Sequence, residues 1–377
     1  MNTDSELAAK TELLPVAVAG LFPVLSVVAP KASAVLLALT GIYGIGLAIK
    51  RGAWRDLFPL APVIFMALAL GWMFYRGLTT FDGRTGVGVG FKVLALGISG
   101  FGAFWLFKTM SAEGKRRVHN ALIAGICLSL AVFAFLVVTY RIGGIWLLDA
   151  GLENPLASLS RGQMILAMVS VLAWVVLLER KRPVAAAGLG AATFSVFMLA
   201  PAYTAVLALI VGVLGVLGKT LKGAGLKALA AVLLAAVLAS PIIAPLLLQE
   251  SSSEAFSAEK AKLLAGMNSL DGSVSHRLYI WTFATGRALE RPFLGWGLDT
   301  SRRIPGGKTL ISIGKETLPL HPHNATLQVW LELGLPGLIF LAGVVGFALL
   351  ASPPARSAAL ARGLRAGTVL AVFAIAN

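Results

Sequence analysis

The chain has 377 residues, of which 58% are hydrophobic and only 13% charged, and its formal net charge is +15. Roughly a quarter of the residues in soluble domains are charged, so this composition excludes a soluble globular protein and assigns the chain to a membrane. Cys127 is the only cysteine, which excludes a disulfide framework and a cysteine-ligated metal site.

Apolar runs separated by short polar breaks predict an all-α, polytopic transmembrane helical bundle, because a helix needs roughly 20 apolar residues to cross a bilayer. Ten candidate spans follow one another along the chain, at residues 13–28, 32–49, 57–75, 87–107, 121–140, 162–178, 183–199, 204–217, 228–248 and 335–350. The apolar stretch 183–217 is too long for one span, so we divide it at Ala200-Pro201-Ala202-Tyr203. A further run starts at Ala366 and is too short to cross by Asn377, so we expect a longer native chain with about 11–12 spans.

The positions of lysine and arginine predict the orientation, since positive residues in short loops stay on the cytoplasmic side. With the N-terminus cytoplasmic, far more of them fall in inner segments than in the short outer loops, which hold only Lys31, Arg76, Arg84, Arg141 and Arg161. This topology also accounts for most of the net charge, so the sequence predicts no nucleic-acid partner. The acidic start of the chain is unlike a cleaved signal peptide, so we expect the first span to be retained.

Three domains are predicted: transmembrane helices 1–9 in residues 1–248, an outer loop domain in residues 249–324, and C-terminal transmembrane helices in residues 325–377. The loop is longer than unstructured connections usually are, so we expect it to be helical and to carry the functional site. An amphipathic helix is predicted at 251–267, lying either on the membrane surface or in solvent as a spacer.

A second loop helix is predicted at 275–290, ended by Pro292 and by the turn Gly295-Trp296-Gly297. Helical periodicity places its arginines on one side as a row of guanidiniums, namely Arg277, Arg287 and Arg291. Downstream residues continue the basic character, namely Arg302, Arg303 and Lys308. The alternative is that these cations pair with Glu290, with Asp271 or with lipid headgroups.

The loop closes with His321-Pro322-His323-Asn324, followed by a predicted short helix at 325–333 and by the junction Gly334-Leu335-Pro336-Gly337. This order places His323 at the outer membrane boundary. Together with His276, the two histidines could suggest zinc, but their spacing matches no standard ligand set, and we predict no metal site.

An outer site has no nucleotide supply, so a transferase there needs a membrane-bound, activated donor such as a polyprenyl diphosphate sugar. Its leaving group requires charge neutralisation, by a divalent metal or by arginine pairs. The loop acids are scattered and offer no Asp-x-Asp pair, which leaves the task to arginine, whose planar fork suits phosphate. The acceptor hydroxyl needs a base that is neutral near pH 7, which histidine can be. Arg277 and His323 are the candidates for these two roles.

Arg161 is a third candidate, because it stands at the outer mouth of the sixth predicted span and an ionisable residue there is a functional hypothesis by default. The alternative is that its side chain snorkels to the headgroups.

Two blocks of this chain resemble a known family. His323-Asn324, nine residues, Gly334, two residues and Gly337 are similar to the His-Asn-x9-Gly-x-x-Gly signature of the bacterial O-antigen ligase and polymerase superfamily. The upstream arrangement resembles the family's second block and consists of Ser275-His276-Arg277, Trp281, Arg291-Pro292 and Gly295-Trp296-Gly297.

The resemblance implies a GT-C-like glycosyltransferase of the bacterial inner membrane that works on the periplasmic side without metal or other cofactor. Its partners would be undecaprenyl-diphosphate-linked O-antigen, lipid A-core oligosaccharide and membrane lipids. The essential histidine and two arginines of the family correspond to His323, Arg277 and Arg161, with His323 as general base, the arginines on the diphosphate and inversion at the sugar. Further candidates for binding the diphosphate or the glycan are Arg291, Arg287, Arg302, Arg303, Asn324 and His321.

The signature is shared by three activities, which are ligation to lipid A core, glycan polymerisation and protein O-glycosylation. We favour the ligase, because this chain has one dominant outer loop whereas polymerases tend to carry two. A transporter of lipid-linked glycan is the alternative outside the enzymes, although the sequence shows neither two related halves nor clear midplane charges.

Overall fold

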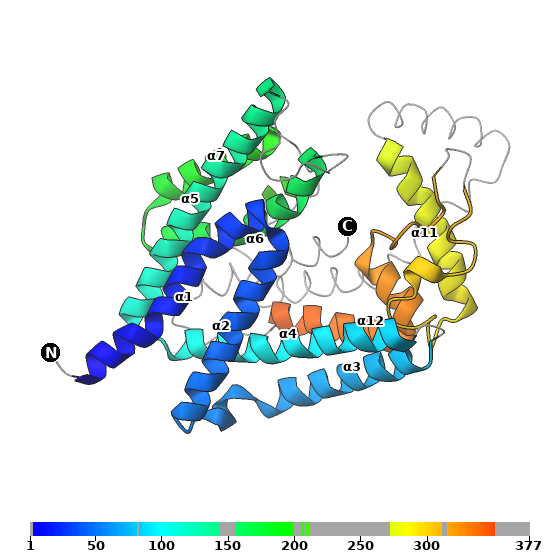
Figure 1. Ribbon diagram of the computed structural model, residues 1–377, viewed down its shortest axis with the longest axis horizontal. Coiled ribbons are helices and arrows are strands. Elements are labelled where there is room, and N and C mark those ends of the chain that lie inside the picture. Colours follow the sequence, from blue (N-terminus) through cyan, green and yellow to red (C-terminus); the bar gives the residue numbers. More distant parts are fainter. Residues whose placement is uncertain are drawn as a thin grey trace. The chain divides into compact units, whose positions relative to one another are not determined.

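The computed structural model describes residues 3–80, 83–143, 155–199, 205–206, 209–210, 272–310 and 315–350, and these residues are almost entirely helical (Figure 1). The α-helices are α1 (Thr3–Val28), α2 (Pro30–Lys50), α3 (Leu60–Leu78), α4 (Gly83–Thr109), α5 (Ala112–Gly143), α6 (Pro155–Glu179), α7 (Pro183–Leu199), α11 (Gly272–Glu290) and α12 (Ala325–Leu350). Short 3-10 turns, η1 (Trp54–Leu57) and η2 (Ser301–Arg303), and a bridge between Leu310 and Glu316 complete the described structure. The helices predicted at 204–217, 228–248 and 251–267 and the run from Ala366 lie wholly or mostly outside these residues.

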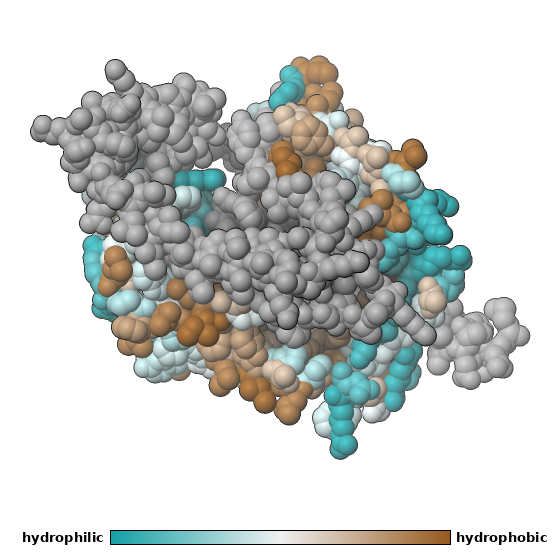
Figure 2. Space-filling model, turned by 180° about the vertical axis from the view of Figure 1, so that it is seen from behind, coloured by the Kyte–Doolittle hydropathy of each residue, from teal (hydrophilic) through white to brown (hydrophobic). Residues whose placement is uncertain are grey.

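Seven of the described helices contain an apolar stretch long enough to cross a membrane, and the predicted polytopic helical fold is confirmed. They are α1 to α6 and α12, while α7 is apolar but only 17 residues long. Broad areas of the described surface are apolar on the face drawn in Figure 2. Large apolar side chains such as Leu68 and Phe104 are exposed, as expected for helices that contact lipid.

Several helices begin at other residues than the predicted spans do, and two of these differences have a clear local reason. The third span was expected to begin at 57, but Pro59 disfavours helical backbone at the residue before it, and α3 starts at Leu60. The fifth span was expected to begin at 121, because the preceding charged residues resemble a loop. Instead α5 starts at Ala112, and the Ser111 hydroxyl oxygen accepts a hydrogen bond from the Gly114 N–H at 2.9 Å as a helix cap.

The described helices form two compact units, and α3 belongs with α11 and α12 although it is far from them in sequence. The other unit contains α1, α2, α5, α6, α7 and the C-terminal part of α4. The predicted domain boundaries at 248 and 324 stay a prediction.

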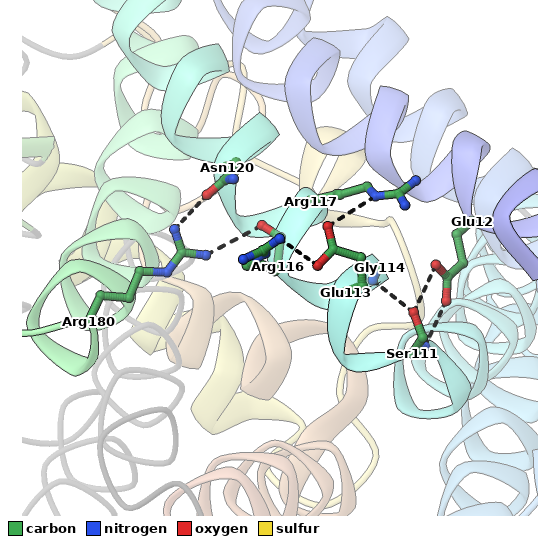
Figure 3. Close-up of polar contacts among 8 residues, drawn as sticks. All are labelled: Glu12, Ser111, Glu113, Gly114, Arg116, Arg117, Asn120 and Arg180. Atoms are coloured by element: carbon green, nitrogen blue, oxygen red, sulfur yellow. Dashed lines mark hydrogen bonds and ion pairs between the residues drawn. The ribbon is translucent and has the colours of Figure 1, made fainter.

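In the first unit, α1 and α5 approach closely, since a Cβ on Gly125 would lie 2.2 Å from the Gly20 carbonyl oxygen. The buried Glu12 of α1 joins the start of α5 by accepting hydrogen bonds from the Ser111 N–H at 2.7 Å and the Ser111 hydroxyl at 3.0 Å (Figure 3). Arg116 pairs with Glu113 in the first turn of α5 at 2.7 Å.

The second unit has its own apolar core between α11 and α12. Ile280, Ala284 and Ala288 recur along one side of α11 and are buried. They pack in one cluster with residues from the following turns and from α12, namely Trp296, Ile304, Leu318, Leu327, Trp330, Leu331 and Leu338.

Candidate active site

The candidate site in the second unit is organised by a break within α12. Gly334 has φ 65° and ψ −160°, so the helical segments on either side of it meet at a kink, with Pro336 just beyond. The predicted short helix at 325–333 and its junction with the last span are therefore confirmed. This break lies inside a candidate span, Ala325–Val344, where polar backbone groups need partners from the protein.

The carbonyls exposed by the kink receive such partners. In a continuous helix the Glu332 carbonyl would accept from residue 336, but proline has no N–H to give. Donors from other segments bond to these carbonyls instead. In the turn after α11, the Trp296 N–H donates to the Leu331 carbonyl at 2.7 Å and the Gly297 N–H to the Glu332 carbonyl at 2.8 Å. From α3, the Trp72 Nε1–H donates to the Leu333 carbonyl at 2.8 Å. The Leu335 N–H and the Trp330 Nε1–H both donate to the Pro292 carbonyl, at 3.0 and 3.1 Å.

The glycines of this junction allow two backbone segments to touch. A Cβ on Gly334 would lie 2.2 Å from the Phe293 carbonyl oxygen, and a Cβ on Gly295 would lie 2.6 Å from the Glu332 carbonyl. Both glycines also have φ of about 65°, which L side chains disfavour. Gly295 of the second block thus packs directly on the first glycine of the His-Asn signature, while Pro292 and Gly297 bond to the nearby Leu335 and Glu332.

Arg291 and His323 belong to the two segments that frame this junction. His323 adopts φ 53°, an uncommon conformation for a residue with a side chain. Its ring lies 4.2 Å, centroid to centroid, from that of His321, and the His323 N–H donates to His321 Nδ1 at 3.3 Å. Asn324 caps α12, because its Oδ1 accepts from the Leu327 N–H at 2.9 Å.

Helix α11 is joined to the histidine segment through Trp281. The Trp281 Nε1–H donates to the Pro322 carbonyl at 2.8 Å, directly before His323. Arg277 lies one helical turn before Trp281 and on the same side of α11, and it is partly buried. Its guanidinium has neither an ion pair nor a hydrogen bond with any residue that the structure describes.

His276 is linked to the loop backbone, since its Nε2 lies 2.8 Å from the Glu316 carbonyl oxygen. The Glu316 carboxylate pairs with Lys308 at 2.7 Å. Within the described ranges, no three or more His, Cys, Asp or Glu side chains gather in a way that could hold a metal ion. Asp271, one of the loop acids, lies outside these ranges.

The helix end predicted at 290 is confirmed, since α11 ends at Glu290 and Arg291 lies in the turn beyond it, while the row of guanidiniums stays a prediction. Arg287 pairs with Glu290 at 2.9 Å and lies over the Phe283 ring at 5.3 Å. Arg291 lies over the Trp296 ring at 4.3 Å, where Arg287 also lies at 6.0 Å, and no acidic side chain in the described structure pairs with Arg291.

The other basic residues of the loop have acidic or other partners. Arg302 lies 3.7 Å from the Asp299 carboxylate, and its side chain is exposed. Arg303 is exposed, and it too has an interaction partner. These partners set both residues apart from Arg277.

Two buried charged residues of the site were missed from the sequence, Arg76 and Glu332. Arg76, near the end of α3, donates to the Gly295 carbonyl at 2.9 Å and to the Thr79 hydroxyl at 2.6 Å, and its side chain is almost completely buried. The sequence alone indicates Arg76 only as an outer-loop charge. An arginine directly at the end of an apolar run was the available signal.

Glu332 lies inside the last turn before the α12 kink and is 4% exposed. Its carboxylate accepts hydrogen bonds from the Asp299 N–H at 2.8 Å, from the Ser301 hydroxyl and from Gln328 Nε2 at 3.3 Å. It thereby fastens the η2 turn to α12. An isolated acid within the apolar sequence around residues 325–333 was the signal that could have identified it.

Arg161 lies in the second turn of α6, in the first unit, directly before the candidate span Gly162–Glu179. The backbone position agrees with the predicted mouth of that span. Its side chain is outside the described structure.

A family model described as O-antigen ligase matches residues 150–342, just over half of the chain. The chain belongs to the O-antigen ligase family. The matched range contains both units' candidate residues, from Arg161 to His323, and the whole α12 kink.

Named relatives agree with this family. A Rickettsia conorii protein is 28% identical over 232 residues, covering 60% of this chain and 53% of that protein. A Rickettsia felis protein is 28% identical over 236 residues, covering 59% and 53%, and a Rickettsia prowazekii protein is 33% identical over 131 residues, covering 34% and 30%. All three carry names that propose a polysaccharide ligase. The chain spans about half the length of the first two.

Proposed function

We propose that this protein is an O-antigen ligase, a glycosyltransferase that transfers O-antigen from undecaprenyl diphosphate to lipid A-core oligosaccharide at the periplasmic face of the bacterial inner membrane. The family assignment and the relatives named as polysaccharide ligases support a reaction on a glycan. The lipid carrier, the acceptor and the side of the membrane are part of the proposal.

The observation that carries the proposal is the link between α11 and the histidine segment. Trp281 bonds to the carbonyl next to His323, and Arg277 stands one turn before Trp281. A basic side chain suited to phosphate and a side chain suited to proton transfer are thus held by neighbouring segments of one unit.

In the proposed reaction, the acceptor hydroxyl oxygen attacks the anomeric carbon of the donor sugar, and His323 takes the hydroxyl proton. The bond between that carbon and the diphosphate oxygen breaks, and undecaprenyl diphosphate leaves as an anion. Direct displacement inverts the anomeric centre. Arg277 neutralises the charge that grows on the diphosphate, with no divalent metal and no other cofactor.

Arg291 is the second cation of this unit that we assign to the donor diphosphate. Stacking over Trp296 fixes its guanidinium plane, while the described structure gives it no carboxylate that would compete with phosphate. Arg161 is proposed as a further ligand from the sequence resemblance. Arg287 and Arg302, which already pair with acids, are weaker candidates.

The experiment that separates the possible activities offers the acceptors one at a time. Purified protein in proteoliposomes receives undecaprenyl-diphosphate glycan with lipid A-core, with a second lipid-linked glycan, or with an acceptor protein. We expect product only with lipid A-core. Product only in the second or third reaction would make the protein a polymerase or a protein glycosyltransferase.

A transporter is tested in the same vesicles with the His323→Ala variant. The ligase proposal expects this variant to lose product formation. If wild-type protein forms no product but moves the lipid-linked glycan across the bilayer, and His323→Ala abolishes that movement, the protein is a transporter.

A further inference from the structure

A hydrogen bond from Trp281 of α11 joins that helix to the turn that presents His323. His321, Pro322 and His323 form this turn between the loop and α12. The Pro322 carbonyl lies at its centre and accepts from the Trp281 Nε1–H at 2.8 Å. Because a peptide unit is planar, fixing that carbonyl also fixes the orientation of the His323 N–H at the other end of the same peptide bond.

His323 needs such support, since its φ of 53° is disfavoured for a residue with a Cβ. Backbone of this kind persists only where the surroundings hold it. Asn324 fixes the side of the turn that leads into α12. Trp281 holds the other side, from a helix that lies far away in sequence.

Trp281 is itself well placed to be rigid. Its partly buried ring packs against the apolar cluster of α11 and α12. A rotation of the indole would therefore require the cluster to repack. The hydrogen bond thus transmits the position of α11, including Arg277, to the turn that carries His323.

We propose that Trp281 is a positioning residue, whose indole N–H sets the place of the His323 imidazole relative to the donor bound at Arg277. This inference rests on the proposed function and deepens it. Trp281 does not need to touch the donor or the acceptor. Its loss is therefore expected to slow the chemical step and to leave donor binding unchanged.

The test compares two tryptophans of the same cluster that both donate to a proline carbonyl. Trp281→Phe removes the bond to Pro322, and Trp330→Phe removes the 3.1 Å bond to Pro292 at the α12 kink. Both changes keep an aromatic ring in the core. If Trp281→Phe does not fold, Trp281 is replaced by its analogue with sulfur in place of the indole N–H. This analogue keeps the size of the ring and removes the hydrogen-bond donor.

We expect Trp281→Phe and the sulfur analogue to lower kcat about tenfold, with an unchanged KM for the lipid-linked donor and a shifted pH profile of kcat. Trp330→Phe, which loses a bond at the kink and leaves the His323 turn bonded to Trp281, should keep the wild-type pH profile of kcat. The same pH-profile shift in both tryptophan variants, or no loss in Trp281→Phe and the analogue, would refute the positioning role.

A readout that does not use turnover separates this inference from the proposed function. Diethyl pyrocarbonate modifies accessible neutral imidazole, and mass spectrometry follows its attachment to His323. The rate at His323 should change several-fold in Trp281→Phe and in the sulfur analogue, and stay as in wild type in Trp330→Phe. Unchanged rates in all variants would overturn the inference, whereas a wild-type protein that transfers no glycan would overturn the proposed function.

Discussion

The arginines between residues 272 and 310 differ in their partners more than in their sequence surroundings. Arg287 and Arg302 pair with Glu290 and Asp299, three residues away in each case. Arg277 and Arg291 have no acidic partner in the described structure. A guanidinium without a carboxylate can bind a phosphate without first breaking an ion pair, which is why these two residues are assigned to the diphosphate.

Arg277→Lys keeps the charge and removes the planar fork. We expect kcat/KM for glycan transfer to fall by about tenfold or more, because a bidentate contact to phosphate is lost. Initial rates in proteoliposomes measure this, with Arg116→Lys as control, since Arg116 lies on α5 in an exposed pair with Glu113. Near-normal transfer by Arg277→Lys would show that Arg277 does not bind the diphosphate in this way.

The Glu332 carboxylate accepts hydrogen bonds from three donors. In Glu332→Gln an amide takes its place, and the N–H₂ group of that amide is a donor that faces other donors. We expect a loss of about 1–3 kcal/mol in the free energy of unfolding, seen as a lower melting temperature in detergent. Glu316→Gln, which breaks an exposed pair with Lys308, should cost less than about 1 kcal/mol. Equal melting temperatures for Glu332→Gln and wild type would contradict the role assigned to this carboxylate.

At the scale of elements, the kink of α12 could be predicted from the sequence, whereas its partners could not. Gly334 and Pro336 within an apolar run indicate a break, and the structure has it at Gly334. The partners, Trp72 of α3 and the turn after α11, are distant in sequence and carry no local pattern that would pair them with it. Buried charges such as Arg76 were assigned to loops for the same reason: topology counting does not report tertiary contacts.

The end of α11 shows the same division. Pro292 predicts that the helix stops at 290, and α11 ends at Glu290. The position of His323 beside α11, in contrast, depends on a contact across 41 residues. The sequence pattern predicts which arginines and histidines are candidates for the site. Which of these side chains have partners depends on tertiary packing.

Gly334→Ala tests the close packing at the kink. A Cβ there would lie 2.2 Å from the Phe293 carbonyl oxygen, and φ 65° with ψ −160° is a region used almost only by glycine. We expect the unfolding free energy to drop by at least about 1–3 kcal/mol. Gly46→Ala on α2 is the matched control, because a Cβ there meets nothing within 4 Å, and it should be neutral or slightly stabilising. A Gly334→Ala protein as stable as the control would argue against this junction.

At the scale of the whole molecule, the hydropathy and the positions of Lys and Arg predict a polytopic bundle with its N-terminus inside. The seven candidate spans of the described structure confirm the helical membrane fold. The orientation stays a prediction, since length and hydropathy do not distinguish the two sides of a membrane.

Single-cysteine variants can test this orientation in a Cys127→Ser background. Lys308 lies in the segment predicted to be outside and Arg116 at the start of α5, and both side chains are exposed in the structure. We expect a membrane-impermeant thiol reagent to label Lys308→Cys in intact spheroplasts and Arg116→Cys only after lysis. The reverse pattern would invert the topology and place the candidate site in the cytoplasm.

The proposed mechanism requires that His323 and the arginines transfer the glycan without a metal ion. The most direct measurement is the initial rate of O-antigen transfer to lipid A-core by purified protein in proteoliposomes containing an excess of chelator, for wild type and His323→Ala. We expect the wild-type rate to be the same with and without chelator and the His323→Ala rate to be lower by about a hundredfold or more. A wild-type rate that falls in chelator and returns with a divalent ion, or a His323→Ala variant with near-normal turnover, would contradict it.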